Sequence, residues 1–174
     1  MPTNKYKDEQ DRALGLGGMA ASLVMWENAR YIQQISLDAP VGEGVTLTPD
    51  FFQAPNQRAS AKAVWTRDVE IFHAQAGMVI ANLASRAIVG EREAVSAEQR
   101  DTLVKALAER GREACGLEEP EVAEVARKIL NYFSQVLVYP AAAAVVSSFA
   151  ARLVEERTME RGRVIELLSP LERL

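Results

Sequence analysis

The chain has 174 residues, a length typical of one domain, and its 48% hydrophobic and 25% charged residues argue against both a disordered chain and a polytopic membrane protein. Its net charge of -4 gives no general attraction to phosphate groups, which argues against nucleic-acid binding. Cys115 is the only cysteine, which excludes an intramolecular disulfide and fits a reducing compartment, so we expect a cytoplasmic protein.

The first predicted element is one long helix over residues 6–37. This segment contains no proline, and its apolar side chains recur at helical spacing. Gly17 and Gly18 weaken the helix, because a glycine in a helix interior costs about 1 kcal/mol relative to alanine. Gly17 and Ala21 lie one turn apart, as do Gly18 and Ser22, so we expect a neighbouring helix to approach closely at these small residues.

A connection follows over residues 38–48, which are rich in glycine and proline, with a short extended piece at residues 45–47. Thr48 before Pro49 has the order of a helix N-cap and a first helical residue. We therefore expect a short helix over residues 49–53.

Two further helices are predicted in the middle of the chain. The first spans residues 57–89 and ends at Gly90. Ser96 with Gln99 three residues later forms a capping box, which predicts a helix that begins there and ends near Gly116. The polar face of that helix is densely charged, so we expect it at the surface of the molecule.

A fourth long helix is predicted to begin near Pro120 and to continue into an uncharged run, residues 129–151. Pro140 interrupts the run, and we expect a kink there rather than an end, because Tyr139 is a poor cap for a new helix. A last amphipathic helix is predicted over residues 159–168.

The uncharged run 129–151 is long enough to cross a bilayer, but it contains several polar residues and a central proline. We expect no membrane span and interpret the run as a helix buried on all sides in the middle of a bundle. The predicted fold is all-α: a four-helix-bundle-like single domain, residues 1–174, with long helices and short accessory helices.

Three helices of one chain would not fully cover a helix that is apolar on every side, so we expect a homo-oligomer, in which a second copy contributes to the packing. A different protein partner is the alternative. The predicted contact residues lie on the uncharged run and are Tyr132, Gln135, Tyr139, Ala143 and Phe149.

One pattern suggests a metal site. Glu70 and His73 form a Glu-x-x-His pair on one helix face, and Glu27 on the first helix could add a carboxylate. Ferritin-like bundles hold two iron or manganese ions with such residues. His73 is the only histidine, whereas the usual dinuclear pattern uses two. The alternative interpretation is that Glu70 pairs with Arg67 and that His73 packs at a helix surface.

No nucleophile–base pair and no phosphate-binding loop can be assembled from the sequence, so we assign no catalytic residues and no cofactor and expect a binding or assembly module rather than an enzyme. The sequence leaves two alternatives. One is the ferritin-like metal or redox protein, and the other is a small-molecule binder with an apolar pocket near the expected kink at Pro140.

Overall fold

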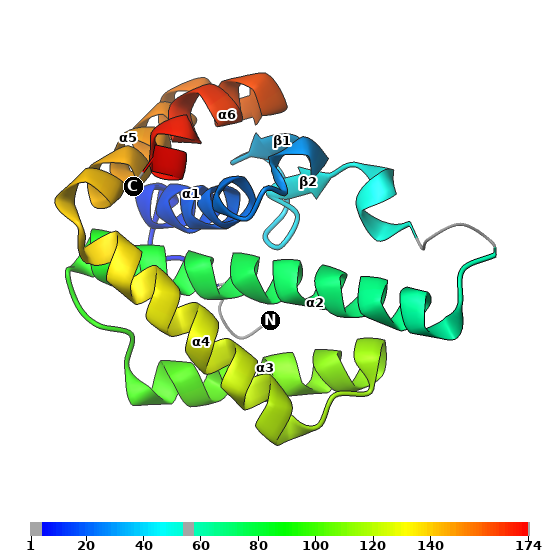
Figure 1. Ribbon diagram of the computed structural model, residues 1–174. Coiled ribbons are helices and arrows are strands. Elements are labelled where there is room, and N and C mark those ends of the chain that lie inside the picture. Colours follow the sequence, from blue (N-terminus) through cyan, green and yellow to red (C-terminus); the bar gives the residue numbers. More distant parts are fainter. Residues whose placement is uncertain (1–4, 54–57, 174) are drawn as a thin grey trace.

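The computed structural model describes residues 5–53 and 58–173 of the chain, and the described part is mostly helical, as predicted (Figure 1). The long elements are α1 (Glu9–Met25), α2 (Ala61–Ala84), α3 (Ala97–Cys115), α4 (Glu119–Val138) and α5 (Pro140–Glu156). The shorter α6 (Arg161–Leu168) lies near the C-terminus, and β1 (Ile32–Ser36), β2 (Val45–Leu47) and β3 (Thr158–Glu160) form a small sheet.

The predicted helix over residues 6–37 is wrong in its second half. The Asp8 side chain caps α1 by accepting a hydrogen bond from the Asp11 N–H at 2.8 Å, and α1 ends at Met25. Beyond it, Glu27 has a φ of 59° and the chain turns into strand β1.

The sheet explains why strand β1 resembles a helix in the sequence. Its order is β2-β1-β3, with both pairs antiparallel. Ile32 and Ile35 are three residues apart, which is helical spacing, yet both are fully buried in the strand. An irregularity in the β1–β2 register between Ile32 and Gln34 makes this arrangement feasible, because a bulge turns the side chains that follow it to the other face. The short extended piece predicted at residues 45–47 is confirmed as β2.

The middle helices follow the prediction more closely. Helix α3 has the predicted capping box at Ser96 and Gln99, and it ends at Gly116, whose φ is 67°. Helix α2 continues into a π-helix, η3 (Ser85–Glu91), and the chain leaves it at Arg92, which has a φ of 59°. The predicted first residue of this helix, residue 57, lies outside the described residues. The short helix after Thr48 is the 3-10 helix η2 (Pro49–Phe52).

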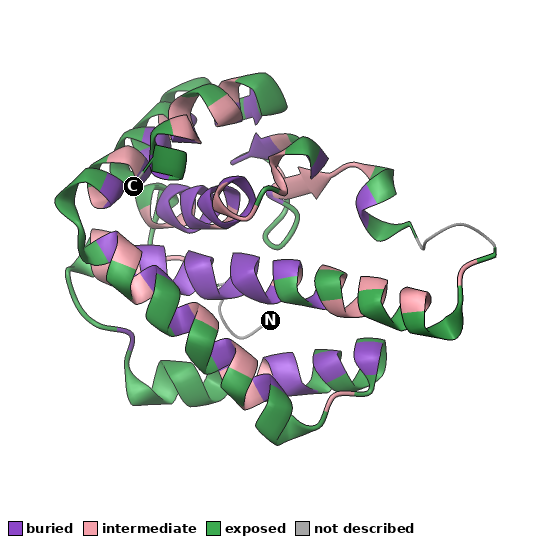
Figure 2. Ribbon diagram, viewed as in Figure 1, coloured by how far each residue is buried: buried purple, intermediate pink, exposed green. Residues whose placement is uncertain are grey.

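Helix α1 is the buried element at the centre of the fold. It lies between α2 on one side and α5, α6 and the sheet on the other, while α3 and α4 pack against α2 (Figure 1). Most of its residues are buried (Figure 2). The predicted close approach is confirmed: a Cβ on Gly18 would lie 2.8 Å from the Ala81 carbonyl carbon of α2, and one on Gly17 would lie 3.1 Å from Phe149 of α5.

Two predictions for residues 129–151 are wrong. At Pro140 the chain does not kink within one helix: α4 ends at Val138, Tyr139 is extended, and α5 begins at Pro140 with the two helices bent by 91°. The steric effect of a proline on the residue before it favours this extended conformation, and proline is well placed at the first position of a helix. A four-helix bundle is not confirmed, because the predicted fourth helix is two helices that turn across the molecule.

The uncharged run is also not buried on all sides. Leu130, Phe133 and Leu137 of α4 and Val146 and Phe149 of α5 face the core, whereas the opposite faces of both helices are exposed (Figure 2). Within the described residues, no single helix has the length and apolar character needed to cross a membrane; α4 and α5 satisfy that test only when they are taken together, as a bent pair.

The last predicted helix, residues 159–168, begins two residues later than expected, since α6 starts at Arg161. Met159 belongs to β3 instead, where it pairs with Ile35 of β1 and is buried. This non-local pairing joins the C-terminal part of the chain to the segment that follows α1.

Candidate functional site

The residues of the predicted metal site do not form a ligand cluster. Among the residues that the structure describes, no group of three or more His, Cys, Asp and Glu side chains could hold a metal ion. Glu70 is exposed and pairs with Arg67, with 3.2 Å between Oε2 and Nη1, as the alternative interpretation predicts. His73 lies at the surface of α2, where partial burial lowers its pKa. Glu27 is exposed in the turn after α1 rather than in the middle of a helix.

Cys115 has no features of a catalytic nucleophile. It is buried at the end of α3, and burial, with the negative charge of Asp68 as a second cause, raises the pKa of its thiol. A raised pKa leaves less of the reactive thiolate at neutral pH.

The bend between α4 and α5 forms a groove with a volume of about 650 Å³. We call it the bend groove. Its walls come from three parts of the chain: the end of the π-helix η3 with the segment that follows it, the last turns of α4, and the first turns of α5. The lining residues are Ile88, Val89, Arg92, Glu93, Ala94, Ser134, Leu137, Val138, Pro140, Ala143, Ala144 and Ser147.

The local sequence explains why a groove forms there. The 91° bend at Pro140 directs α5 away from the axis of α4, so the two helices diverge from one corner. Arg92, in the left-handed conformation, turns the chain sharply out of the π-helix and supplies the opposite wall. Ala143 and Ala144 carry only methyl groups, so their side chains do not fill the space between these walls.

Exposed apolar side chains lie directly beside the groove. Val138 is 70% exposed and Tyr139 is 66% exposed, and they occupy the corner between the two helices. We call Val138 and Tyr139 the corner residues. Tyr132 lies farther back on α4 and is 38% exposed, with its ring packed against Trp26 at a centroid distance of 6.1 Å. The corner residues are therefore free to contact a partner, whereas Tyr132 is partly held by the chain's own core.

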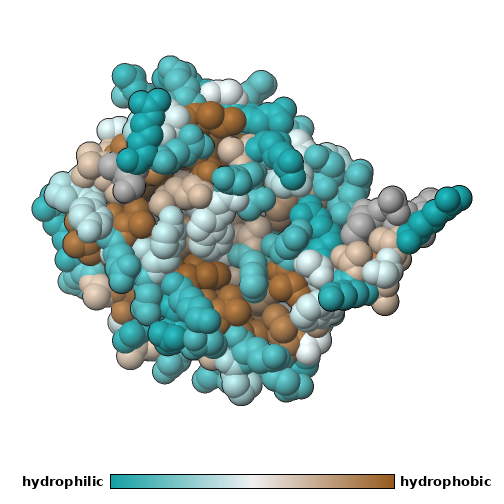
Figure 3. All heavy atoms as spheres, in the orientation of Figure 1, coloured by the Kyte–Doolittle hydropathy of each residue, from teal (hydrophilic) through white to brown (hydrophobic). Residues whose placement is uncertain are grey.

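The exposed surface that α4 and α5 contribute beside the groove carries no charge. The exposed residues between Lys128 and Arg152 are Asn131, Tyr132, Gln135, Val138, Tyr139, Pro140, Ala141, Ala144, Ser147, Ser148 and Ala151. We call them the uncharged strip. The exposed face of α3, in contrast, is rich in acidic and basic side chains. On the face of the molecule in Figure 3, hydrophobic residues likewise reach the surface in patches between hydrophilic ones.

The charged residues in the lining of the groove are Arg92 and Glu93. Neither side chain forms an ion pair with another residue in the described ranges. The groove is thus lined mainly by apolar residues, together with two serines and one charge of each sign that forms no ion pair with a described residue. A partner surface with the same two charges could pair with both.

The predicted contact residues are only partly brought together. Tyr132, Gln135 and Tyr139 are exposed on the uncharged strip, and Ala143 lines the groove. The prediction for Phe149 is wrong. Its side chain is fully buried in the chain's own core, where it packs against Gly17, so it is not available to a partner.

The sequence reasoning missed the groove wall formed by Ile88, Val89 and Arg92. These residues lie about 50 positions before the bend in the sequence, and no local pattern relates the two segments. A comparison with protein-family models, with curated proteins and with solved structures finds no match to this chain.

Proposed function

We propose that this chain is a binding and assembly module that associates with a second copy of itself through the bend groove. The observation that carries the proposal is a mainly apolar groove with two exposed apolar side chains, Val138 in its lining and Tyr139 next to it, and an uncharged exposed surface along α4 and α5. Monomeric proteins rarely expose large contiguous apolar patches, and the cores of protein interfaces are depleted of charged residues.

A second copy suits this surface because the same patch carries both exposed apolar side chains and a mainly apolar groove. In a two-fold dimer each copy presents the same patch, so a protruding group on one must fit a recess on the other. Val138 and Tyr139 protrude beside the groove, and the groove of the second copy would accept them. Arg92 of one copy would face Glu93 of the other, which pairs opposite charges without introducing an unpaired one.

The test measures the molar mass of the intact chain in solution. Light scattering or sedimentation across a series from micromolar to millimolar concentration should show a monomer–dimer equilibrium. Ala144→Glu places a carboxylate in the mainly apolar lining of the groove, and we expect it to weaken dimerisation by about 2 kcal/mol or more, about 30-fold or more, because a charge buried without a partner is costly. Tyr139→Ser removes one corner residue and should weaken dimerisation in the same direction.

A matched control makes the result specific. Ala114→Glu is the same substitution at an exposed helical position on α3, whose outer face is already charged, and it should leave the dimer unchanged. Circular dichroism on each variant shows whether the fold is retained. A chain that stays monomeric at every concentration, or an Ala114→Glu variant that dissociates as readily as Ala144→Glu, would contradict the proposal.

The second candidate function is binding of a small apolar molecule in the same groove. Its volume lies within the range of about 300–1,000 Å³ that is usual for small-molecule sites, and it lies at Pro140, where the sequence places the alternative pocket. Ala143→Phe would fill the groove. An apolar fluorescent dye that binds to the native chain at concentrations where it is monomeric, and that does not bind to Ala143→Phe, would favour this function. Cytoplasmic localisation stays a prediction under both candidate functions.

A further inference from the structure

A second cavity, of about 310 Å³, lies between α1, α2 and the loop that joins β1 to β2. Its apolar wall includes Leu16 and Met19 of α1 and Val79 of α2. Its polar groups include Asn82 of α2, Glu43 of the loop and Arg110 of α3. No residue of this cavity lines the bend groove, so an inference about it is independent of the proposed function.

The loop over this cavity is held in place by the chain itself. Gly42 has a φ of 96°, a conformation that residues with a side chain rarely adopt. Gly44 packs against α1 so closely that a Cβ there would lie 2.7 Å from Leu16 Cδ2. Arg12 of α1 donates hydrogen bonds to the carbonyl oxygens of Ala39 and Pro40, the latter at 3.3 Å. The chain's own contacts therefore hold the loop that walls the cavity, and most small-molecule sites are likewise largely pre-formed.

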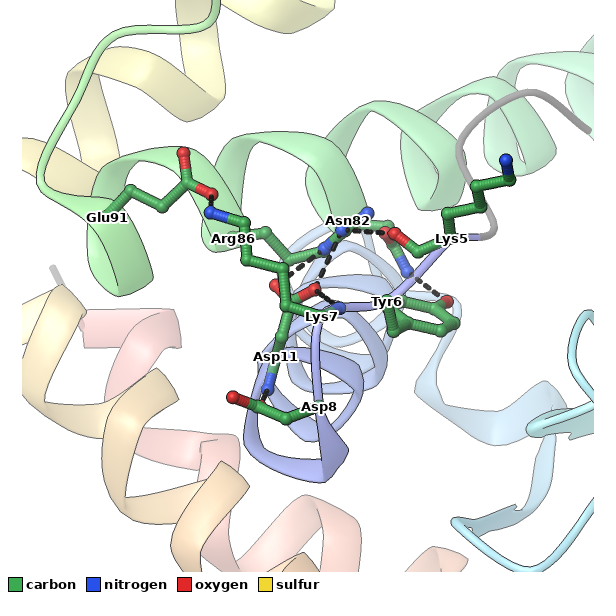
Figure 4. Close-up of polar contacts among 8 residues, drawn as sticks. All are labelled: Lys5, Tyr6, Lys7, Asp8, Asp11, Asn82, Arg86 and Glu91. Carbon is green, nitrogen blue, oxygen red and sulfur yellow. Dashed lines mark hydrogen bonds and ion pairs between the residues drawn. The ribbon is translucent and has the colours of Figure 1, made fainter.

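One wall of the cavity is fixed by the polar cluster in Figure 4. Arg86 binds both carboxylate oxygens of Asp11, each at 2.8 Å, and lies over the ring of Tyr6 at 4.8 Å from its centroid. Tyr6 in turn accepts a hydrogen bond from Nδ2 of Asn82 at 3.1 Å. This chain of contacts ties the segment before α1 to α2 and holds Tyr6 and Asn82 at the cavity.

Asn82 is the polar group in this wall whose hydrogen bonding is incomplete. Its side chain is only 5% exposed, and its Oδ1 is buried with no hydrogen-bond partner in the described part of the chain. An amide has one acceptor and two donors, so exchanging its oxygen and nitrogen would still leave a polar atom unpaired. The Oδ1 atom has less than 1 Å² of accessible surface and the amide packs against Gly15 of α1, so this unpaired oxygen lies within the wall and does not itself face the cavity.

Three charged side chains line this cavity, and two of them, of opposite sign, have no partner in the described part of the chain. Glu43 and Arg110 both line it, and neither forms an ion pair or side-chain hydrogen bond with any described residue. Arg12 also lines the cavity, with its guanidinium bonded to the carbonyl oxygens of Ala39 and Pro40. An anion alone would leave Glu43 without a partner, and a simple amine would be repelled by both arginines. A ligand with both charges would satisfy both residues.

We propose that this cavity binds a free α-amino acid with an apolar side chain. Arg110 would pair with the carboxylate of the ligand, and Glu43 would pair with its ammonium group. The apolar side chain would then lie against Leu16, Met19 and Val79, which fits a cavity at the small end of the usual range.

The test is calorimetry on the full chain with L-leucine as the probe. Isocaproate lacks the ammonium group of leucine and isoamylamine lacks its carboxylate, so each should bind about tenfold more weakly or worse, since each forfeits a charge-assisted hydrogen bond. Arg110→Gln and Glu43→Gln change exposed residues that the fold does not need, and each should weaken leucine binding by about tenfold.

Arg112→Gln is the matched control, because Arg112 is exposed on the same helix but does not line the cavity. It should bind leucine as the native chain does. The proposal is overturned if millimolar leucine does not bind, if isocaproate or isoamylamine binds as tightly as leucine, or if Arg110→Gln and Arg112→Gln have the same affinity.

Discussion

The contact between α1 and α2 at Gly18 gives the sharpest test of how this fold is packed. A Cβ at this position would overlap the carbonyl oxygen of Ala81 and Ser85 Oγ and would lie 2.8 Å from the Ala81 carbonyl carbon. The obstacle is the backbone of α2, which cannot rotate aside as a flexible side chain could. Gly18→Ala must therefore push the two helices apart along a contact that is buried throughout.

Two opposed effects set the change in the free energy of unfolding that we expect for Gly18→Ala. Overpacking a core costs about 1–3 kcal/mol, and a backbone obstacle places Gly18→Ala at the upper end. Alanine recovers about 1 kcal/mol because it is the better helix former. We expect a net loss of about 2 kcal/mol in the free energy of unfolding, or a fall in Tm of about 4–8 °C for a chain of this length.

The assay is urea unfolding followed by circular dichroism, with Gly162→Ala as the control. Gly162 lies in α6, and a Cβ there would meet nothing within 4 Å, so the same substitution should be neutral or stabilise by up to about 1 kcal/mol. Because the two substitutions should change stability in opposite directions, the comparison separates the effect of close helix approach from that of helix propensity. A Gly18→Ala variant as stable as the native chain would refute the close-approach explanation.

The remaining predictions concern two buried titratable groups. Arg86→Met leaves the Asp11 carboxylate without its guanidinium partner in a site where both side chains are nearly buried. It should lower the free energy of unfolding, measured in urea, by about 3 kcal/mol. The double variant Asp11→Asn/Arg86→Met removes the unpaired charge and should lose less stability. Burial raises the pKa of Asp11, but the hydrogen bonds from Arg86 and from the Lys7 N–H together lower it by more than burial raises it. The pKa of Asp11 therefore lies below its ordinary value. The native chain should therefore lose this contribution as the pH falls below about 4. In Arg86→Met burial acts on Asp11 without the guanidinium, so this variant should instead gain stability as the pH falls toward about 4, where the buried carboxylate takes up a proton. The Cys115 thiol should react slowly with a chromogenic disulfide reagent at neutral pH and rapidly once urea unfolds the chain, and fast labelling of the folded protein would contradict its burial.

The features that could be predicted from the sequence are those fixed by neighbours along the chain. The capping box at Ser96 and Gln99 brings its partners within one turn, so it identifies the start of α3 without tertiary information. The small residues at Gly17 and Gly18 also signal a close helix contact locally. Which helix makes the contact could not be predicted, and the structure gives α5 for Gly17 and α2 for Gly18.

The features that could not be predicted depend on partners far along the chain. Ile32 and Ile35 have helical spacing, but the segment pairs with β2, with a register irregularity between Ile32 and Gln34, and with β3, so it forms a strand. The candidate sites have the same property. The bend groove joins η3 to α4 and α5, and the second cavity joins the β1–β2 loop to Arg110 of α3, so neither appears as a motif.

The uncharged run 129–151 shows why a lack of charge does not by itself indicate burial. The element at the centre of the fold is α1, whose glycines and alanines let helices approach from two sides, while half of the uncharged run faces outward. In a monomer, charged side chains at exposed helical positions favour solubility, and α3 shows that this chain uses them freely. Their absence from the uncharged strip therefore has no explanation in the chain's own packing. A covering partner supplies one, because charge is unfavourable in the core of an interface, and the bend groove is where the apolar side chains of that partner would be buried.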